Sequence, residues 1–194
     1  MNVLEAIKAR RSVRSFEPLP VRSADIMTLL DAAVHAPSAL NTQPWSFAIV
    51  QDRELLQRFS DGAKRVALQH VAHDPKSAHY EALLRGEAFD VFHGASTLIV
   101  MSAVQPGAYG DAAVWLAAEN LMLAACAIGL GTCCIGLAIP FLNTAELKAE
   151  LSIPPTGRIV AAIAVGHPSG VQPTLPRAAP SIVCWLRDAA HRST

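Results

Sequence analysis

Charged residues are scarce in this 194-residue chain: Asp, Glu, Lys and Arg make up 16% of it, and their charges cancel. With a formal net charge of +0, the chain lacks the basic excess of proteins that bind nucleic acid or an anionic membrane surface. Hydrophobic residues reach 52%, which is high for a monomer whose whole surface faces water. We therefore expect a partner chain to cover part of the surface.

Signals for a membrane or an export pathway are also missing. The longest apolar run, residues 112–130, carries Glu119 and Asn120 at its middle, where a bilayer would make both costly. The N-terminus begins with a charged, amphipathic helix pattern instead of a signal peptide. We expect a cytoplasmic protein.

No motif of hydrolysis or metal binding is present. The chain has no GxSxG, no P-loop, no kinase motifs and no HExxH. Its cysteines form no CxxC or zinc-like spacing, which favours reduced thiols. Three histidines lie close in sequence, but no cysteine or carboxylate pattern completes a ligand set, so no metal site is predicted. These are His70, His73 and His79.

Hydrophobic periodicity predicts one domain over residues 1–194, with one sheet flanked by helices. Asn2, Ser23 and Asn143 are expected as helix N-caps. Helices are predicted over residues 2–10, 23–36, 111–128 and 143–151, and strands over 46–50, 96–103 and 158–166. Residues 51–93 have a mostly helical pattern with breaks at Gly62, residues 74–75 and Gly86, and the proline-rich tail ends in a strand-like stretch at 181–186.

Three segments contain groups that can bind a ligand. The first holds Arg10, Arg11, Ser12 and Arg14, whose guanidinium and hydroxyl donors suit a phosphate. The alternative is a solvated basic helix end, stabilised by the helix dipole. The second is the loop at 36–45 (APSALNTQPW), which is rich in amide and hydroxyl groups and lies between a helix and a strand. The alternative there is a plain polar connector.

The third segment is the glycine-bounded stretch 131–136, which follows a long apolar helix. A dinucleotide fingerprint would follow a strand and open a helix, so this order excludes a Rossmann site. Its backbone N–H groups can instead bind a flat polar group. Together with Arg177 in the tail, the three segments suit a ligand with one phosphate and one flat polar ring, as in flavin mononucleotide (FMN).

In these segments the chain resembles the FMN-dependent nitroreductase family, and the matching pieces occur in family order over nearly the whole chain. They are RRSVRSF at 10–16, APS at 36–38, NTQPW at 41–45, NLMLAA at 120–125, IGLGTC at 128–133, VGHP at 165–168 and PR at 176–177. The resemblance implies an α+β sandwich with a mainly antiparallel sheet, a homodimer with an exchanged C-terminal arm, and FMN at the dimer interface.

The resemblance also implies roles for individual residues. Phosphate contacts would come from Arg10, Ser12 and Arg177, with Arg11 near the phosphate or ribityl chain and Arg14 at the pyrimidine edge. In the loop, Pro37, Ser38 and Ala39 would come from the other subunit, while Asn41 and Gln43 approach the chain's own flavin. Backbone groups of Cys134, Ile135 and Gly136 would lie near flavin N5.

The activity implied is ping-pong reduction of nitroaromatics or quinones, with hydride from NADH or NADPH passing through flavin N5. No catalytic side chain is predicted, because the cofactor carries the chemistry. Reduction of activated alkenes, dehalogenation, oxidation of a bound intermediate, a non-enzymatic flavin-binding sensor and a scaffold that binds another anion remain alternatives. Three departures from the family pattern stand out: Glu119 where many relatives have glutamine, a short link at 105–110 that predicts an open site, and no clear second basic residue for the pyrimidine edge, with Lys64 and Arg65 as candidates.

Overall fold

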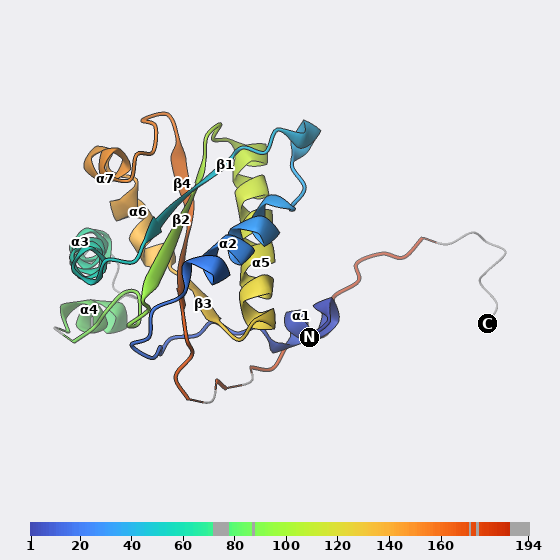
Figure 1. Ribbon diagram of the computed structural model, residues 1–194, viewed down its shortest axis with the longest axis horizontal. Helices are drawn as coiled ribbons and strands as arrows, with labels where there is room; N and C mark the ends of the chain where they lie inside the picture. Colours follow the sequence, from blue (N-terminus) through green and yellow to red (C-terminus); the bar gives the residue numbers. More distant parts are fainter. Residues whose placement is uncertain (72–77, 87, 171, 174, 187–194) are drawn as a thin grey trace.

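A four-stranded antiparallel sheet with the strand order β1-β2-β4-β3 forms the centre of the protein (Figure 1). The two inner strands, β2 and β4, are the most apolar, as expected for strands that are covered on both faces. Isoleucines of these strands, Ile99 and Ile163, lie opposite each other at the middle of the sheet. The strands are β1 (Trp45–Val50), β2 (Thr97–Ala103), β3 (Gly131–Cys134) and β4 (Arg158–Gly166).

The structure is a computed structural model and describes residues 1–71, 78–86, 88–170, 172–173 and 175–186, with side chains omitted over 70–80. Its helices are α1 (Val3–Ala9), α2 (Ser23–Val34), α3 (Arg53–Val71), α4 (Ala78–Arg85), α5 (Ala108–Ala127), α6 (Ile139–Leu142) and α7 (Ala145–Glu150). Within these ranges, no helix combines the length and the apolar character needed to span a membrane.

Helices cover both faces of the sheet, so the chain forms a three-layer sandwich. Alternation along β2 divides the core: Leu98 and Val100 pack under α3 and α6, whereas Ile99 and Met101 pack under α2 and α5. All four side chains are fully buried. Each contributes roughly 1.5–3 kcal/mol to stability through burial.

The strands predicted over residues 46–50, 96–103 and 158–166 and the long helices are confirmed, but two of the three expected N-caps are wrong. Asn2 caps α1 in a reciprocal capping box with Glu5. At α2 the cap position is Arg22, whose guanidinium pairs with the Asp25 carboxylate at 2.7 Å, so Ser23 is already helical. At α7 the cap is Thr144.

Asn143, which was expected to cap α7, has a different role in packing. Its side chain donates to the carbonyl of Ile159 and accepts from the N–H of Ile159, at 2.8 and 2.9 Å. Asn143, which directly follows α6, therefore connects the end of this helix to β4, although its spacing from Glu146 is that of a capping box. Sequence distance alone does not reveal this contact.

The strand expected at 181–186 is absent from the described chain. This stretch is extended, belongs to no sheet and exposes Ile182 and Val183 by 61% and 97%. Figure 1 shows it leading away from the sandwich beyond α1. The hydrophobic pattern is that of a strand, but the described part of the chain offers it no neighbouring strand to pair with.

The break expected at Gly62 is also wrong, because α3 continues through it from Arg53 to Val71. A Cβ built on Gly62 would lie 2.2 Å from the ring tip of Phe141 in α6. The glycine therefore makes room for an aromatic ring between two helices. The break at Gly86 is confirmed, since α4 ends at Arg85, and residues 74–75 lie outside the described part.

We expect Gly62→Ala to destabilise the protein by about 1–3 kcal/mol, because the added methyl group overpacks the contact with Phe141. The helix propensity of alanine, worth about 1 kcal/mol, opposes this loss only in part. Urea unfolding of the wild type, Gly62→Ala, Phe141→Leu and the double variant measures the coupling. If the clash with Phe141 causes the destabilisation, Phe141→Leu lowers the free energy of unfolding less in the Gly62→Ala background than in the wild type. Strictly additive effects on the free energy of unfolding would contradict the clash.

Candidate functional site

The predicted phosphate-binding residues lie on a short segment that leaves α1 and docks on β3. We call residues 10–14 the N-terminal arm. Ser12 forms a parallel bridge with Thr132, and the N–H of Val13 donates to the carbonyl of Thr132 at 2.9 Å. A Cβ built on Gly131 would lie 2.8 Å from Val13 Cγ2, so only glycine allows this approach. The arm thus covers the outer edge of β3.

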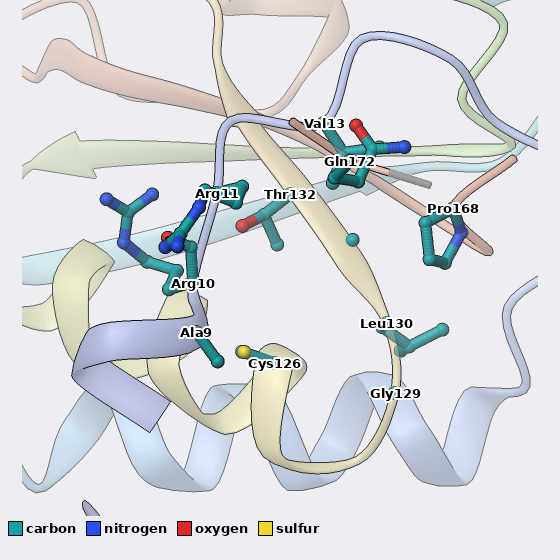
Figure 2. A pocket seen from close by; sticks show the side chains of 11 residues that line it. Ala9, Arg10, Arg11, Val13, Cys126, Gly129, Leu130, Thr132, Pro168 and Gln172 are labelled. Carbon is teal, nitrogen blue, oxygen red and sulfur yellow. The ribbon is translucent and has the colours of Figure 1, made fainter. Parts of the chain in front are cut away.

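One cavity, of about 170 Å³, lies between the arm, the end of α5 and the start of the C-terminal segment (Figure 2). Arg10 and Arg11 lie on one side of it and Pro168 on the other. Gln172 also lines it. This cavity brings together the arm and the start of the segment leading to Arg177, the two parts of the chain from which phosphate contacts are expected.

The three arginines of the arm have different surroundings. The Arg10 side chain is mostly buried, 19% exposed, and its Nε lies 3.6 Å from the Glu119 carboxylate on α5. Arg11 donates to the carbonyls of Lys8 and Arg10 at 2.5 and 2.8 Å, which caps the end of α1. For Arg11, the alternative of a basic helix end therefore describes what the structure shows.

Arg14 lines a second cavity, of about 400 Å³. Cys134 and Gly136 line this cavity, as expected for residues near a flavin ring. So does His93, which the sequence analysis did not select. The remaining wall is largely apolar and includes Leu83, Leu84, Phe89, Val91 and Leu137.

The backbone that follows β3 is only partly free to bind a ligand. Ile135 donates its N–H to the carbonyl of Ala162 at 2.8 Å, and its side chain is buried in the core. Ile135 lines the Arg14 cavity, so the expectation that backbone groups of Cys134, Ile135 and Gly136 lie near flavin N5 stays a prediction, although the Ile135 N–H is already bonded within the sheet. Because N–H groups alternate in direction along a strand, the N–H of Cys134 points away from β4, toward the arm side.

The two cysteines in this cavity are poor nucleophiles. Partial desolvation, followed by the neighbouring Cys133, raises the pKa of Cys134 to about 11. Although Cys134 reaches the surface, its sulfur packs against Met122 Sδ at 3.5 Å. Burial likewise raises the pKa of Cys133. Both are thiols at neutral pH, so the geometry provides no thiolate.

The amide-rich loop lies far from the arm in the same chain. Pro37, Ser38 and Ala39 line a hollow with Ala112 near the start of α5, whereas Cys126 at the end of α5 lines the arm cavity. Fourteen residues at about 1.5 Å each place these two points about 21 Å apart along the helix. Figure 1 shows the loop and α1 at opposite ends of α5.

Asn41 and Gln43 belong to this distant loop, held by the Gln43 N–H donating to Ser38 Oγ at 2.9 Å. Both have positive φ angles, 55° and 47°. The expectation that they approach the flavin of their own chain is not supported, because the loop is one unit at the far end of α5.

The other candidates are placed as follows. Arg177 is exposed on the C-terminal segment, five positions after Gln172. Lys64 is engaged with the Asp61 carboxylate at 2.9 Å, and neither it nor Arg65 lines the Arg14 cavity. Among the side chains that the structure describes, no three His, Cys, Asp or Glu are grouped for a metal ion; those of His70, His73 and His79 lie outside this set.

Comparison with known proteins agrees with this arrangement. The model of the Nitroreductase family matches residues 7–167, and the chain belongs to this family. A protein of Archaeoglobus fulgidus named as an NADH dehydrogenase/NAD(P)H nitroreductase is 29% identical over 170 residues, covering 85% of this chain and 84% of its own. An iodotyrosine deiodinase of Thermotoga neapolitana is 27% identical over 175 residues, covering 88% and 90%.

Solved structures share the fold. A nitroreductase with bound FMN from Bacteroides fragilis superimposes with a TM-score of 0.81 at 24% identity, covering 96% of this chain and all of its own. An iodotyrosine deiodinase bound to FMN and 3-iodo-L-tyrosine gives 0.77 at 25% identity, with the same coverage. The expected sandwich with an antiparallel sheet is confirmed.

Proposed function

We propose that this chain is an FMN-dependent oxidoreductase that oxidises NADH or NADPH and reduces a small electron-poor acceptor, such as a nitroaromatic or a quinone. The observation that carries the proposal is the docked N-terminal arm, on which Arg10 lines the smaller cavity and Arg14 lines the larger one. Family membership and the names of the relatives support the same class of reaction.

The donors of the arm fit the chemistry of FMN. Arg10 and the exposed hydroxyl of Ser12 suit the phosphate, and the exposed Arg177 is a third donor from the C-terminal segment. Arg14 provides a positive charge beside an apolar cavity of about 400 Å³, which suits a flat ring that gains negative charge on reduction. FMN supplies the two-electron transfer when it is bound.

In the proposed reaction, the protein's own side chains position the cofactor and shield its ring. With both cavity cysteines protonated, neither provides a thiolate there, which agrees with a reaction carried by a cofactor. Apolar side chains form most of the cavity wall, which suits packing against a flat ring.

We further propose a homodimer in which each site takes residues from both chains. The loop with Pro37, Ser38, Ala39, Asn41 and Gln43 cannot reach its own arm, so we assign the whole loop to the partner's site. Exposed apolar side chains on α1 and α5 supply a surface for this contact, among them Leu4, Ile7, Trp115 and Leu116. In the described sheet, β1 is an edge strand, and its outer side can accept the exchanged stretch 181–186 as an added strand.

A second candidate reaction is reductive dehalogenation. It is favoured by the iodotyrosine deiodinase of Thermotoga neapolitana, which is related over 88% of this chain. Both reactions need the same cofactor and differ in the acceptor. Turnover of 3-iodotyrosine against nitrofurazone or menadione, under anaerobic conditions with dithionite or a nicotinamide as reductant, separates them.

The first test of the proposal is an absorbance spectrum of the purified protein. We expect a yellow protein, or one that turns yellow and retains FMN after desalting, and bleaching by NADH or NADPH without oxygen. A protein that stays colourless with added FMN would overturn the proposal. Bound FMN that neither nicotinamide bleaches would favour the sensor instead.

Substitutions of Arg10 and of Glu119 should change FMN affinity in opposite directions. Arg10→Ala should weaken FMN binding by about 1.5–3 kcal/mol, because a charged hydrogen bond is lost. Glu119→Gln should strengthen it by about 0.2–1 kcal/mol, since the carboxylate competes with the phosphate for Arg10 across a partly exposed ion pair. Titration of the apoprotein by flavin fluorescence quenching measures both.

The matched control is Glu146→Gln in the exposed first turn of α7, which removes the same charge far from the arm and should leave FMN affinity unchanged. Riboflavin, which lacks the phosphate, should bind the wild type and all three variants alike. If Arg10→Ala weakens riboflavin as much as FMN, Arg10 does not hold the phosphate.

The dimer is tested at Ile182 and Val183. Neighbouring residues of a strand face opposite sides, so replacing both by Asp places one charge on the buried side whichever side that is. We expect a shift from dimer to monomer in analytical ultracentrifugation and weaker FMN binding. Replacing both by Thr, which retains strand propensity, is the milder control; an Asp variant that stays dimeric would contradict the exchange.

A further inference from the structure

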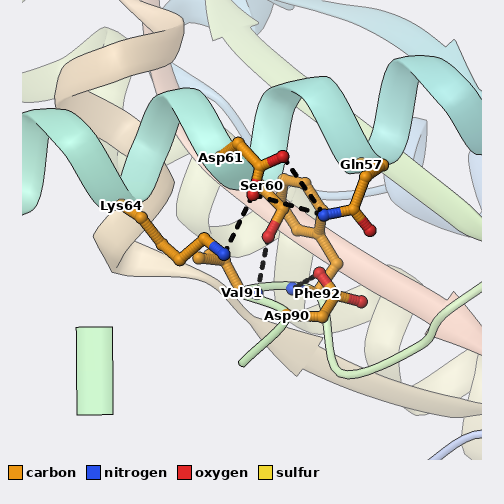
Figure 3. Close-up of polar contacts among 7 residues, drawn as sticks. All are labelled: Gln57, Ser60, Asp61, Lys64, Asp90, Val91 and Phe92. Carbon is orange, nitrogen blue, oxygen red and sulfur yellow. Dashed lines mark hydrogen bonds and ion pairs between the residues drawn. The ribbon is translucent and has the colours of Figure 1, made fainter. Parts of the chain in front are cut away.

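His93 lies in a tight turn between α4 and β2 that is fixed by hydrogen bonds from two directions. The Asp90 carboxylate accepts from the N–H of Phe92 at 2.9 Å and of Gly94 at 2.7 Å. From α3, the buried Ser60 hydroxyl accepts from the N–H of Val91 at 2.9 Å. Figure 3 shows the Ser60 and Asp90 contacts beneath α3. The backbone on either side of His93 is therefore held in place.

The backbone of His93 itself is in the left-handed region, with φ of 59°. This conformation is uncommon for a residue with a side chain, although histidine adopts it more readily than most. Such strained residues persist where surrounding contacts impose them and gather at ligand sites. Here the residue in this imposed conformation lines the cavity that holds Arg14.

The imidazole is half-buried at the wall of this cavity, with Arg14 from the arm and Cys134 and Gly136 from the end of β3. Its ring packs edge-to-face on Phe89, with centroids 6.3 Å apart. Among the described residues, the ionisable groups that face it are Arg14 from the arm, Asp90 from its own turn, and Cys133 and Cys134 from β3. The cavity therefore has a polar end, made by His93 and Arg14, and an apolar wall.

Burial, and then the nearby Arg14 charge, lower the pKa of His93, while Asp90 opposes this shift. The imidazole is therefore neutral at pH 7. A neutral imidazole offers one N–H donor and one acceptor nitrogen. The pyrimidine edge of a flavin ring carries carbonyl acceptors and one N–H donor, so it can bond with both kinds of group.

We propose that His93 is a flavin-binding residue that holds the pyrimidine edge of the ring together with Arg14. This inference rests on the proposed function and deepens it, because it names the side chain that fills a position for which Lys64 and Arg65 were the sequence candidates. His93 positions the ring through hydrogen bonding; the arm holds the phosphate.

The test compares apoprotein affinity for riboflavin and for FMN, measured by fluorescence quenching at pH 7.5. His93→Gly removes the imidazole and relieves the backbone strain, so we expect the variant to stay folded. Thermal denaturation checks that it does. We expect both flavins to bind about threefold to tenfold more weakly, the usual effect of losing a hydrogen bond. His93→Gln, which retains a donor and an acceptor, should keep most of the affinity, and added imidazole should restore binding to His93→Gly.

Two controls separate the possible causes. His35→Gln changes an exposed histidine at the end of α2 and should alter neither affinity. Arg10→Ala should weaken FMN alone, which distinguishes ring contacts from phosphate contacts. The imidazole resonances of His93, assigned by their loss in His93→Gly, should shift on addition of riboflavin.

Unchanged riboflavin affinity in a folded His93→Gly protein would overturn the role of His93 and leave the proposed function intact, provided that the wild type binds FMN. A wild type that binds neither flavin would overturn both. Weaker FMN binding with unchanged riboflavin binding would place His93 near the phosphate and also overturn the inference.

Discussion

The site depends on the docking of the N-terminal arm on β3. A single backbone hydrogen bond, from Val13 to Thr132, and one bridge between Ser12 and Thr132 connect segments that are about 120 positions apart in sequence. The approach is close because Gly131 lacks a Cβ and Val13 packs into the space. If the arm were displaced by one residue, alternation would exchange the directions of Val13 and its neighbours. Arg10 and Arg14 would then no longer serve the two cavities.

The same docking distributes three like charges over different surroundings. The Arg11 guanidinium donates hydrogen bonds to carbonyls at the end of α1, and the charge of Arg10 is offset by the Glu119 carboxylate. Arg14 faces a largely apolar cavity. A cluster that would repel itself in an isolated helix is stable because each guanidinium meets different surroundings. The ion pair with Glu119 offsets the charge of Arg10 before a phosphate binds, and the phosphate then competes with this carboxylate for the guanidinium.

Local signals in the sequence predict most of the fold. The capping box of Asn2 and Glu5, the apolar strands and the long helix ended by Gly129 depend on neighbours in sequence, and all are present. The errors come from contacts across the chain. Gly62 accommodates Phe141, and Asn143 bonds to β4, so in each case a distant element overrides the local pattern. His93 was missed for the same reason: only the folded chain brings its turn to Arg14.

For the loop around Asn41 and Gln43, family resemblance selected the residues but assigned these two to the flavin of their own chain, which the fold does not support. A rigid helix of 20 residues, α5, separates this loop from the arm, and no local rearrangement of the loop spans that distance. A site that uses both must therefore draw on two copies of the chain. The high apolar content, the exposed apolar side chains of α1 and α5, and the extended stretch 181–186, which belongs to no described strand, all agree with that single requirement. In the proposed homodimer, both copies of the chain are needed to bind the cofactor, so cofactor affinity and dimer stability should depend on each other.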